Sequence, residues 1–374
     1  MSPKSRQSGR PRASLLQFLT VLLGVYTLGV YALSYTLWSG HWLAGFLMLS
    51  LPVAMLGMVV VFVFWLVVHP ARAWFPLAVL LLGWPFWRRT VAWHASRETL
   101  TGGKPLTVLS YNLRFFDVVA YTEEGRTHTA PRQVDWVAHF DADVKVFQEF
   151  YNSDDPHRPA VFRTRNRLAS AGNPYAVFTK SKRSDGEGFV GLAIFSKYPL
   201  VRRASRVFAP NGNGYLVADL VRGRDTLRLV NVQLYSMGIR VGQVLRQRSY
   251  EGAKTETQGV LKRLKRGFER RNAQIAEVES LVRDSPHPVI LCGDLNETPY
   301  GLAYGSLRQH LRNGFEDAGR GFGFTYNRAP KFIRIDNQFY GGKTDPALRV
   351  TNFKTHAVRF SDHNPVSAKY VVGE

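Results

Sequence analysis

Long apolar runs fill the first quarter of the chain. Residues 15–38 are almost all apolar or small, and residues 42–68 and 73–87 repeat this pattern after short breaks. A helix rises about 1.5 Å per residue, so each of the first two runs is long enough to cross a hydrocarbon core of about 30 Å. The third run is shorter and contains two prolines, which makes it a marginal span or a re-entrant piece. The pattern predicts a membrane anchor over residues 1–90, with two or three transmembrane helices.

A cleaved signal peptide is the competing interpretation of the first run. The basic residues before it fit a signal peptide, but the run is too long, no small-x-small cleavage site follows, and two more apolar runs come after it. The basic N-terminus favours a cytoplasmic start, and three spans would then place the rest of the chain outside the cytoplasm. Two spans would place it inside, which Arg88 and Arg89 after the third run favour. We expect a multi-pass membrane protein with three spans and an extracytoplasmic domain.

After residues 91–104, which are expected to be a linker, short apolar runs alternate with helical stretches. Strands are predicted at residues 106–112, 144–148, 191–196, 215–221, 226–234, 288–292, 334–340, 348–355 and 366–372. Helices are predicted at residues 132–140, 254–282 and 304–312. Residues 151–188 are polar, contain Pro and Gly, and are expected to be mostly loop. Many strands with interspersed helices predict an α/β or α+β sandwich over residues 105–374, and the pattern alone does not distinguish the two.

The composition changes sharply near residue 88. The first 87 residues contain no Asp or Glu and five Lys or Arg, which leaves 44 basic and 28 acidic residues, a formal +16, for the rest of the chain. This excess either attracts a polyanion, such as nucleic acid or an anionic lipid surface, or only keeps the domain soluble. Six of these basic residues lie within residues 163–183 of the predicted loop: Arg163, Arg165, Arg167, Lys180, Lys182 and Arg183. The apolar runs have no charged residue in their interiors, which argues against an ion channel or transporter.

Several polar residues share one kind of position, the end of a predicted strand. They are Asn112, Glu149, Asp294, Asn296, Asp362 and His363, and Asp336 lies inside a further strand. Strand ends converge on one rim of a sheet, so residues far apart in sequence can meet there. The alternative interpretations are a surface charge for Glu149 and a plain turn for Asp294 and Asn296. We expect these residues to form one polar site.

Six short stretches match one family in order and spacing. They are LSYN (109–112), FQEF (147–150), GLAIFSKYPL (191–200), GDLNETP (293–299), RID (334–336) and SDHNPV (361–366). With these motifs, residues 106–370 resemble the endonuclease/exonuclease/phosphatase superfamily, which has the DNase I-like fold. The anchor followed by LNETPYG also looks like a bacterial membrane-anchored branch of that superfamily. The resemblance implies a four-layer α/β sandwich and hydrolysis of phosphoester bonds with Mg²⁺ or Mn²⁺ as cofactor.

The resemblance also implies a metal site. Glu149 would supply a carboxylate to the cation, since Mg²⁺ and Mn²⁺ prefer oxygen ligands. Asn112 would hold a ligand water beside it, and Asp362 would join the metal or its water shell. Asn231 and Arg334 are expected to bind substrate.

The remaining motif residues would carry the catalytic chemistry. Asp294 would orient or deprotonate the attacking water, and Asn296 would donate a hydrogen bond to a phosphate oxygen. His363 would stabilise the pentacovalent state, with Asp336 as the carboxylate that fixes its tautomer.

The chain departs from the family pattern on the strand 226–234. Where the family often has a histidine in a pattern like N-x-H-L, this chain has Asn231-Val232-Gln233-Leu234. Gln233 can hydrogen-bond a phosphate oxygen but cannot transfer a proton, which puts protonation of the leaving group in doubt. The residues after Asp336 also differ from the family, which we interpret as a packing variation.

The leading hypothesis is a membrane-anchored, divalent-metal-dependent phosphodiesterase of nuclease type. A phospholipid or head-group phosphodiesterase or phosphatase is the alternative that the membrane anchor favours. A non-catalytic binding module on the same fold is the alternative that Gln233 favours. The expected partner is therefore nucleic acid or phospholipid, and no obligate protein partner is evident.

Overall fold

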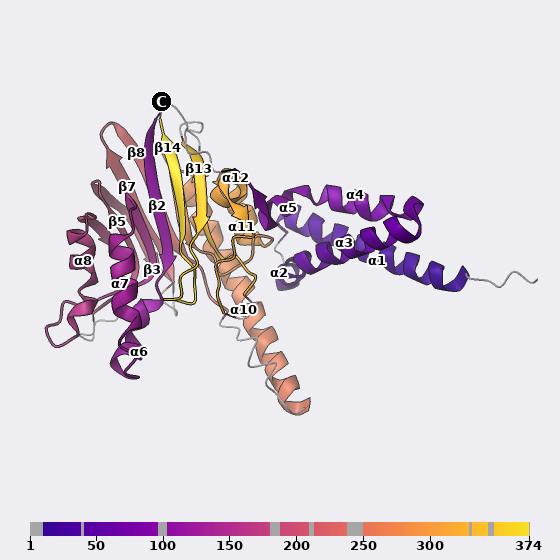
Figure 1. The fold of residues 1–374 in the computed structure, drawn as a ribbon, viewed down its shortest axis with the longest axis horizontal. Helices are drawn as coiled ribbons and strands as arrows, with labels where there is room; N and C mark the ends of the chain where they lie inside the picture. The colour runs from indigo at the N-terminus through magenta and orange to yellow at the C-terminus, as the bar shows by residue number, and fades with distance from the viewer. Residues whose placement is uncertain are drawn as a thin grey trace, which may run out of the picture. The chain divides into compact units, whose positions relative to one another are not determined.

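The structure is a computed structural model that describes residues 10–38, 41–95, 103–179, 188–208, 213–237, 250–328, 331–342 and 348–373. The chain falls into two units (Figure 1). Unit 1 is Met1–Thr90 with Tyr300–Leu302, and unit 2 is Val91–Pro299 with Ala303–Glu374. Three basic residues of the predicted loop, Lys180, Lys182 and Arg183, lie outside the described residues.

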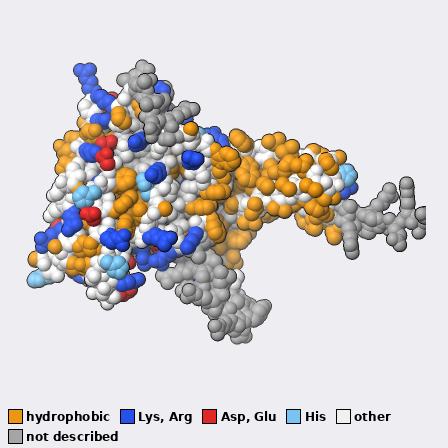
Figure 2. All heavy atoms as spheres, in the orientation of Figure 1, with side chains coloured by type: hydrophobic (Ala, Val, Ile, Leu, Met, Phe, Trp, Pro, Cys, Tyr) orange, Lys and Arg blue, Asp and Glu red, His pale blue; other side chains and the backbone are white. Residues whose placement is uncertain are grey.

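Unit 1 is helical. Its helices are α1 (Arg10–Thr36), α2 (Trp42–Leu49), α3 (Leu51–Val68), the 3₁₀ turn η1 (Pro70–Arg72), α4 (Trp74–Leu82) and α5 (Trp84–Thr90). Among the described residues, Leu15–Thr36 and Leu51–Val68 are long and apolar enough to cross a membrane, judged by length and composition alone. Most of their residues are not buried, and hydrophobic side chains cover unit 1 on the face drawn in Figure 2.

The second and third apolar runs do not form continuous helices. Ser50 separates α2 from α3, and Pro52, which has no backbone N–H to donate, stands in the first turn of α3. Residues 73–87 form α4, with 9 residues, and part of α5, with 7 residues, separated at Gly83. Neither helix reaches the length of about 20 residues that a transmembrane helix needs. Residues 73–87 therefore fit the marginal or re-entrant piece that the sequence suggests, and the number of spans stays a prediction.

Unit 2 contains two six-stranded sheets within its described residues. Sheet I has the order β10 (Arg312–Asn313), β12 (Asp336–Gly341), β9 (Val289–Asp294), β8 (Asp225–Gln233), β7 (Gly214–Arg222) and β6 (Leu200–Val207). Sheet II has the order β13 (Leu348–Thr355), β14 (Val366–Val372), β2 (Lys104–Asn112), β3 (Val144–Asn152), β5 (Phe189–Ser196) and β4 (Tyr175–Phe178). Two of the pairs are parallel, β8 with β9 and β2 with β3, while the other described neighbours are antiparallel.

The two sheets pack face to face and carry helices on their outer faces (Figure 1). Residues of both sheets, such as Val108 and Ile290, share one buried core. On sheet II, α7 (Thr129–His139) and α8 (Thr164–Ser170) bury apolar residues against β3 and β5. On sheet I, Glu277 of α10 (Tyr250–Arg283) accepts a hydrogen bond from Tyr215 of β7, and Tyr304 of α11 (Leu302–His310) packs on Phe339 of β12. The expected mixed α/β fold is confirmed.

Shorter elements complete unit 2. They are β1 (Ala92–Trp93), which pairs with β11 (Arg320–Gly321), η2 (Arg114–Asp117), α6 (Val118–Thr122), η3 (Ala160–Phe162) and α12 (Gly314–Ala318). The region expected to be a linker, residues 91–104, thus holds strand β1 and the first residue of β2. Residues 96–102 lie outside the described residues.

The sequence pattern missed several elements, among them the edge strands β4 and β6 and the helix α8. β4 and α8 lie within residues 151–188, which were expected to be loop, and β6 follows the predicted strand 191–196. Most residues of β6 are exposed or half-buried, as in its stretch Arg202-Arg203-Ala204-Ser205. An edge strand with so little buried surface needs no apolar alternation, so periodicity gives no signal for it.

Candidate active site

Strand register brings the ends of several strands to one rim. Gln233 and Asp294 are the last residues of the parallel strands β8 and β9 and are register partners. Asp336, the first residue of the antiparallel strand β12, is the partner of Asp294 on the other side. Register partners project to the same face, so these three side chains share one rim of sheet I. Asn112, the last residue of β2, meets them from sheet II because its Nδ2 lies 3.1 Å from Asp294 Oδ2.

Glu149 enters the site through an irregularity in β3. The register of β3 with β5 shifts between Phe147 and Phe150, and Glu149 has a φ of 50°. This bulge re-aims its side chain. Glu149 Oε1 accepts hydrogen bonds from Asn112 Nδ2 at 3.3 Å and from Gln233 Nε2 at 2.7 Å. Burial raises the pKa of Glu149, although nearby His363 and the two amide donors act in the opposite direction.

Asp294 is held by two asparagines and is almost fully buried. Its Oδ1 accepts the backbone N–H of Asn296 at 2.8 Å, and its Oδ2 accepts from the side-chain amides of Asn112 and Asn296 at 3.1 and 3.2 Å. Burial raises the pKa of Asp294 to about 7, because the opposing charge of His363 offsets only part of the desolvation. Asn296 Nδ2 also donates to the carbonyl of Leu234 at 2.9 Å. Both hydrogens of the Asn296 amide are thus used inside the protein, which leaves none for the expected phosphate contact.

His363 forms a dyad with Asp336. Its Nδ1 donates to Asp336 Oδ2 at 2.8 Å, and its Nε2 lies 3.8 Å from Asp294 Oδ2. Burial by itself lowers the pKa of His363. The carboxylates of Asp336 and Asp294 raise this pKa by more than burial lowers it, to about 10. The ring is therefore an imidazolium at neutral pH. The backbone N–H of Asp336 donates to Thr325 Oγ1 at 3.1 Å, which fixes the carboxylate behind the ring.

Asp362 lies at the open side of the group and pairs with arginines. Its Oδ2 is 3.8 Å from Arg114 Nε and 3.5 Å from Arg328 Nε. The charge of Asp362 is one of the smaller causes that raise the pKa of Glu149. The preceding residue, Ser361, donates to the carbonyl of Asn112 at 2.9 Å and ties this loop to β2.

The profile of the Endonuclease/Exonuclease/phosphatase family matches residues 109–363. The chain belongs to this family. By class it is a hydrolase that acts on phosphoester bonds. The profile of a domain of unknown function (DUF8431) matches residues 13–90, and a comparison with curated proteins finds no match.

Solved structures of similar fold cover 71–72% of the chain. An endonuclease/exonuclease/phosphatase from Beutenbergia cavernae is 19% identical, with a TM-score of 0.51 and 72% of each chain covered. Sphingomyelinase C from Streptomyces griseocarneus is 18% identical, with a TM-score of 0.48 over 71% of this chain and 99% of its own. A humanized TDP2 from D. rerio is 16% identical, with a TM-score of 0.48 over 71% of this chain and 98% of its own. The first of these supports the DNase I-like fold.

Geometry brings one group of cation donors together in this family member, and the family motifs point to a second pair of carboxylates. One is Asp294, Asp336 and His363, whose ligand atoms all lie within 4.8 Å of one another, and Asp336 Oδ1 is buried without a hydrogen-bond partner among the described residues. A cation there would compete with the proton that Asp336 stabilises on His363. The other is Glu149 with Asp362. Among the described residues, no Lys or Arg lies within ion-pair distance of Glu149, so this buried carboxylate suits a cation.

Asn112 contributes orientation to the second group. Its side-chain oxygen Oδ1 accepts the backbone N–H of Arg114 at 3.1 Å, while its side-chain nitrogen Nδ2 donates to Glu149 and Asp294. The oxygen that a metal would need is thus turned away. Asn112 fits the role of a residue that orients two carboxylates better than the expected role beside a ligand water.

Two expected substrate-binding residues do not reach the group. Asn231 is buried between the sheets, where its amide donates to the carbonyls of Phe147 and Ala193 at 2.8 and 3.1 Å. Arg334 is also buried, with Nη1 2.7 Å from Asn337 Oδ1 and its guanidinium 4.0 Å from the ring centre of Phe315. Substrate contact is not supported for either residue, because both side chains are directed into the interior of the fold.

Sequence reasoning missed Arg271, which lies directly behind the site. This buried guanidinium donates through Nη1 to the backbone carbonyl of Asn296. A signal for it exists in the sequence. The buried apolar residues of α10 fall at positions 264, 268, 275, 278 and 282, and Arg271 stands on the same helical face. A charge on an apolar stripe requires a buried partner, and here the partner is the loop after β9.

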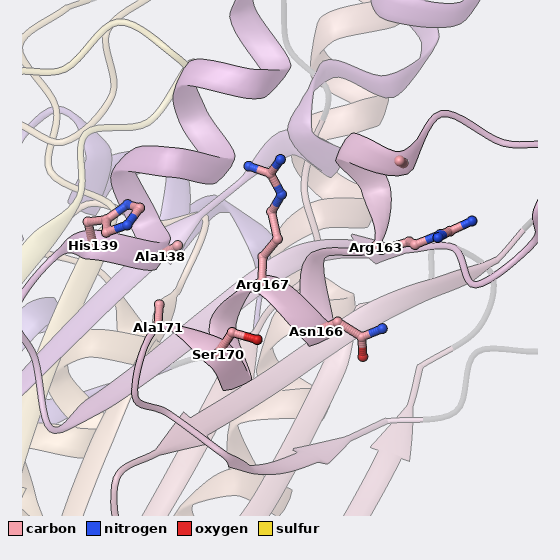
Figure 3. A pocket seen from close by; sticks show the side chains of 8 residues that line it. Ala138, His139, Arg163, Asn166, Arg167, Ser170 and Ala171 are labelled. Carbon is pink, nitrogen blue, oxygen red and sulfur yellow. The ribbon is translucent and has the colours of Figure 1, made fainter.

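A second concave surface lies away from these residues. A hollow of about 410 Å³ is lined by α7, η3 and α8, with Arg163, Arg167 and His139 as its basic residues. In Figure 3 the side chains of Arg163 and Arg167 point in different directions and do not converge on one point. The hollow contains none of the site residues named above, so it is not the catalytic pocket.

Proposed function

We propose that the chain hydrolyses phosphodiester bonds with a divalent cation, using the group around His363. The observation that carries the proposal is the His363–Asp336 hydrogen bond of 2.8 Å beside the buried Asp294. Asp336 fixes the proton on Nδ1, so the imidazolium can donate from Nε2. A charged donor gives a strong hydrogen bond to a phosphate oxygen, and that bond strengthens as negative charge develops in the transition state.

Asp294 prepares the attacking water in this proposal. A general base works best when its pKa is near the working pH, and the raised pKa of Asp294, about 7, meets this condition. The two asparagines that donate to its oxygens keep the carboxylate in one orientation. Asn296 therefore acts through Asp294 rather than on phosphate directly.

Mg²⁺ or Mn²⁺ fits the hard oxygen donors of Glu149 and Asp362. When bound, the cation would neutralise charge on the phosphate and polarise it for attack. Gln233 has no titratable proton, and its hydrogen bond of 2.7 Å to Glu149 suits a positioning role. The absence of the family's histidine at this position therefore leaves the His363 side of the chemistry intact.

We also propose that unit 1 anchors the enzyme in a membrane through Leu15–Thr36 and Leu51–Val68. Both segments keep most of their apolar surface exposed, which is unfavourable in water and favourable in lipid. Because residues 73–87 do not form a third continuous helix, the expected extracytoplasmic side depends on whether α4 and α5 cross the bilayer together.

Nucleic acid is one candidate substrate class, and the observation for it is a group of arginines at the start of α8 (Thr164–Ser170). Arg163, Arg165 and Arg167 are exposed, and no ion pair to an acidic side chain is present for them among the described residues. Guanidinium groups that point apart suit the repeated phosphates of a polyanion better than one small anion. Cleavage of plasmid DNA that weakens steeply with added salt would support this substrate class.

The deciding experiment is hydrolysis of bis-p-nitrophenyl phosphate by the full chain in detergent, with Mg²⁺, Mn²⁺ or EDTA. We expect metal-dependent turnover that falls by about 10²-fold or more in His363→Ala and in Asp294→Ala. His157→Ala changes an exposed histidine of unit 2 and is the matched control. Folded protein without metal-dependent turnover of any phosphodiester would contradict the proposal and favour a binding module.

A further inference from the structure

Exposed aromatic rings stand beside the candidate active site. Phe322 is 52% exposed and Phe332 is 70% exposed, and Phe324 lies between their rings. Phe322 and Phe324 stack at 5.2 Å with planes 13° apart, and Phe324 meets Phe332 edge-on at 6.4 Å. We call these three residues the aromatic edge. Contiguous exposed apolar side chains of this size mark a surface that binds another molecule.

The aromatic edge is fixed to the catalytic loop by hydrogen bonds. Asn364, next to His363, donates through its backbone to the carbonyl of Thr325 at 2.6 Å and through Nδ2 to the carbonyl of Phe324 at 3.4 Å. Tyr326 forms a β-bridge with His363, and the two rings lie 5.4 Å apart. Whatever binds the aromatic edge is thus held at a set position relative to the imidazolium.

The chain segment that carries the aromatic edge is basic, and one of its cations, Arg328, also pairs with Asp362. Residues 318–335 contain four basic residues and no Asp or Glu. Three of the basic residues, Arg320, Arg328 and Lys331, are exposed. Phenylalanine rings flanked by exposed cations are typical of surfaces that rest in the interface of an anionic bilayer.

Chain connectivity relates the aromatic edge to the apolar helices. β1 begins two residues after α5 ends, and its register pairs Trp93 with Arg320 of β11. Trp93 is 84% exposed. Tryptophan is enriched at the membrane–water interface, where its apolar ring and polar N–H both find suitable surroundings. β1 follows unit 1 almost directly in the chain, and Phe322 directly follows its partner strand β11.

We propose that the aromatic edge docks on an anionic lipid bilayer and that the active site acts on a phosphoester carried by a lipid head group. This inference rests on the proposed function for its substrate, but the docking itself does not. Phe322 and Phe324 already stack on each other, and the phenylalanine rings of the aromatic edge have no polar atom that could hydrogen-bond a nucleobase. Insertion between acyl chains needs only the apolar surface of these rings. A bilayer therefore fits the aromatic edge better than a nucleobase.

The docking is tested with the full chain reconstituted in vesicles of phosphatidylcholine and phosphatidylglycerol. An environment-sensitive fluorophore is attached at Phe332→Cys, and Cys292, the single native cysteine, is buried and leaves this position selective. We expect the emission to shift to the blue and to be quenched by brominated acyl chains. Arg224→Cys, an exposed position in the turn between β7 and β8 at the far end of the sheet, is the control. Equal quenching at both positions, or none at Phe332→Cys, would overturn the docking.

The lipid substrate is tested with the double variant Phe322→Ser/Phe332→Ser. We expect head-group release from the same vesicles to fall about tenfold, while hydrolysis of bis-p-nitrophenyl phosphate stays within about twofold, because only docking is lost. Val201→Ser/Val207→Ser removes two apolar side chains of edge strand β6 that are 41% and 39% exposed, and it should leave both activities unchanged.

Three other outcomes would overturn the lipid substrate. A parallel loss of both activities would make the aromatic edge a structural element. A loss of DNA cleavage with unchanged head-group release would make it a nucleobase surface. A wild-type chain that hydrolyses no phosphodiester would remove the proposed function and the lipid substrate with it, and the quenching result would still decide whether the edge contacts the bilayer.

Discussion

Glu149 and Asn296 both hold left-handed backbone conformations with a φ of 50°. Such a conformation costs a non-glycine residue about 1 kcal/mol or more, so the surrounding contacts must impose it. At Glu149 the conformation turns the carboxylate toward Asn112 and Gln233. At Asn296 it allows the backbone N–H and the side-chain amide to reach the same carboxylate, Asp294. Local strain and candidate chemistry coincide at these two residues.

Asp336→Asn tests whether the negative charge of Asp336 is needed by the His363–Asp336 dyad. The amide keeps the size of the side chain but removes the negative charge that raises the pKa of His363, so less of the ring is protonated at neutral pH. We expect kcat for bis-p-nitrophenyl phosphate to fall about 10²- to 10⁴-fold, the usual contribution of a positioned acid or base. Asp225→Asn, in the turn between β7 and β8, is the control, and a wild-type kcat in Asp336→Asn would rule out the dyad.

Gln233→Ala tests whether this residue positions Glu149. The variant removes the shorter of the two hydrogen bonds to Glu149 Oε1. Because partners of metal ligands typically contribute about 10- to 100-fold in metal affinity, the Mg²⁺ concentration for half-maximal activity should rise by that factor. Turnover at saturating Mg²⁺ should recover most of its wild-type value. A lower kcat at unchanged Mg²⁺ affinity would instead assign Gln233 to substrate, and Thr226→Ala on the same strand is the control.

At the scale of elements, α10 supports the active site through Arg271. The buried apolar residues of α10 form a stripe along one face of the helix. The guanidinium of Arg271 lies on that face and donates a hydrogen bond to the carbonyl of Asn296 in the loop after β9. Burial lowers the pKa of Arg271, while Glu297 and Asp294 act in the opposite direction. One helix residue therefore links the outer layer of the sandwich to the catalytic rim.

Arg271→Met should separate positioning from folding. Replacing a buried charge with an apolar side chain of similar length is often neutral for stability, within about 2 kcal/mol. The loop that holds Asn296 and Asp294 loses its donor, so we expect kcat to fall about 10- to 100-fold, with a smaller change in KM. Arg266→Met, on the exposed side of the same helix, is the control. If kcat is retained in a folded Arg271→Met, the positioning role is excluded.

Lys145 of strand β3 is another buried basic residue. Its Nζ donates to the carbonyl of Ala138 at the end of α7 at 2.7 Å. Burial lowers the pKa of Lys145 from 10.5 to about 8, and Lys197 adds to this effect. Below about pH 8 the lysine is charged in both folded and unfolded states, and the folded state bears the full desolvation cost. Between about pH 8 and 10.5 the folded state releases the proton first, so this cost disappears as pH rises.

The resulting prediction concerns the free energy of unfolding. As pH rises from below 8 to above 10.5, the free energy of unfolding of wild type should increase by about 3 kcal/mol relative to that of Lys145→Met. Only wild type contains the buried lysine whose desolvation cost disappears over this range. Thermal unfolding of both proteins across this range measures the difference. Lys369→Met changes an exposed lysine of sheet II and should show no such trend. A pH-independent difference for Lys145→Met would mean that Lys145 is not desolvated.

At the scale of the whole molecule, the two units differ in the surface they present. Unit 1 exposes apolar side chains along its helices, whereas unit 2 exposes many Lys and Arg side chains (Figure 2). An apolar exterior is stable only where water is excluded, so the two units suit different solvents. This difference agrees with the proposal that unit 1 is a membrane anchor.

Extraction of membranes with alkaline carbonate tests the anchor. We expect the full chain to stay with the membrane pellet and to be released only by detergent, because hydrophobic spans are not displaced by pH or salt. A peripheral protein of known behaviour serves as the control. Release into the supernatant would contradict the anchor, and a mature N-terminus beyond residue 36 would identify the first helix as a signal sequence.

The sequence predicts strand positions best where a strand is buried along its whole length. Central strands such as β3 and β9 carry uninterrupted apolar runs because both of their faces are covered, and their positions were predicted correctly. Edge strands β4 and β6 lack that burial and were missed. Arg271 was missed because a single charge within a long basic helix resembles a solvent-exposed residue until the face it occupies is considered.

By itself, the sequence determined the two-part organisation of hydrophobicity, the buried strands and the family motifs, because each depends on residues close together along the chain. The tertiary structure decided which motif residues meet. It joined His363 to Asp336, turned Gln233 and Asn112 toward Glu149, and directed Asn231 and Arg334 away from the rim. The physical reason is that register, bulges and left-handed turns set side-chain direction, and these depend on partners tens to hundreds of residues away.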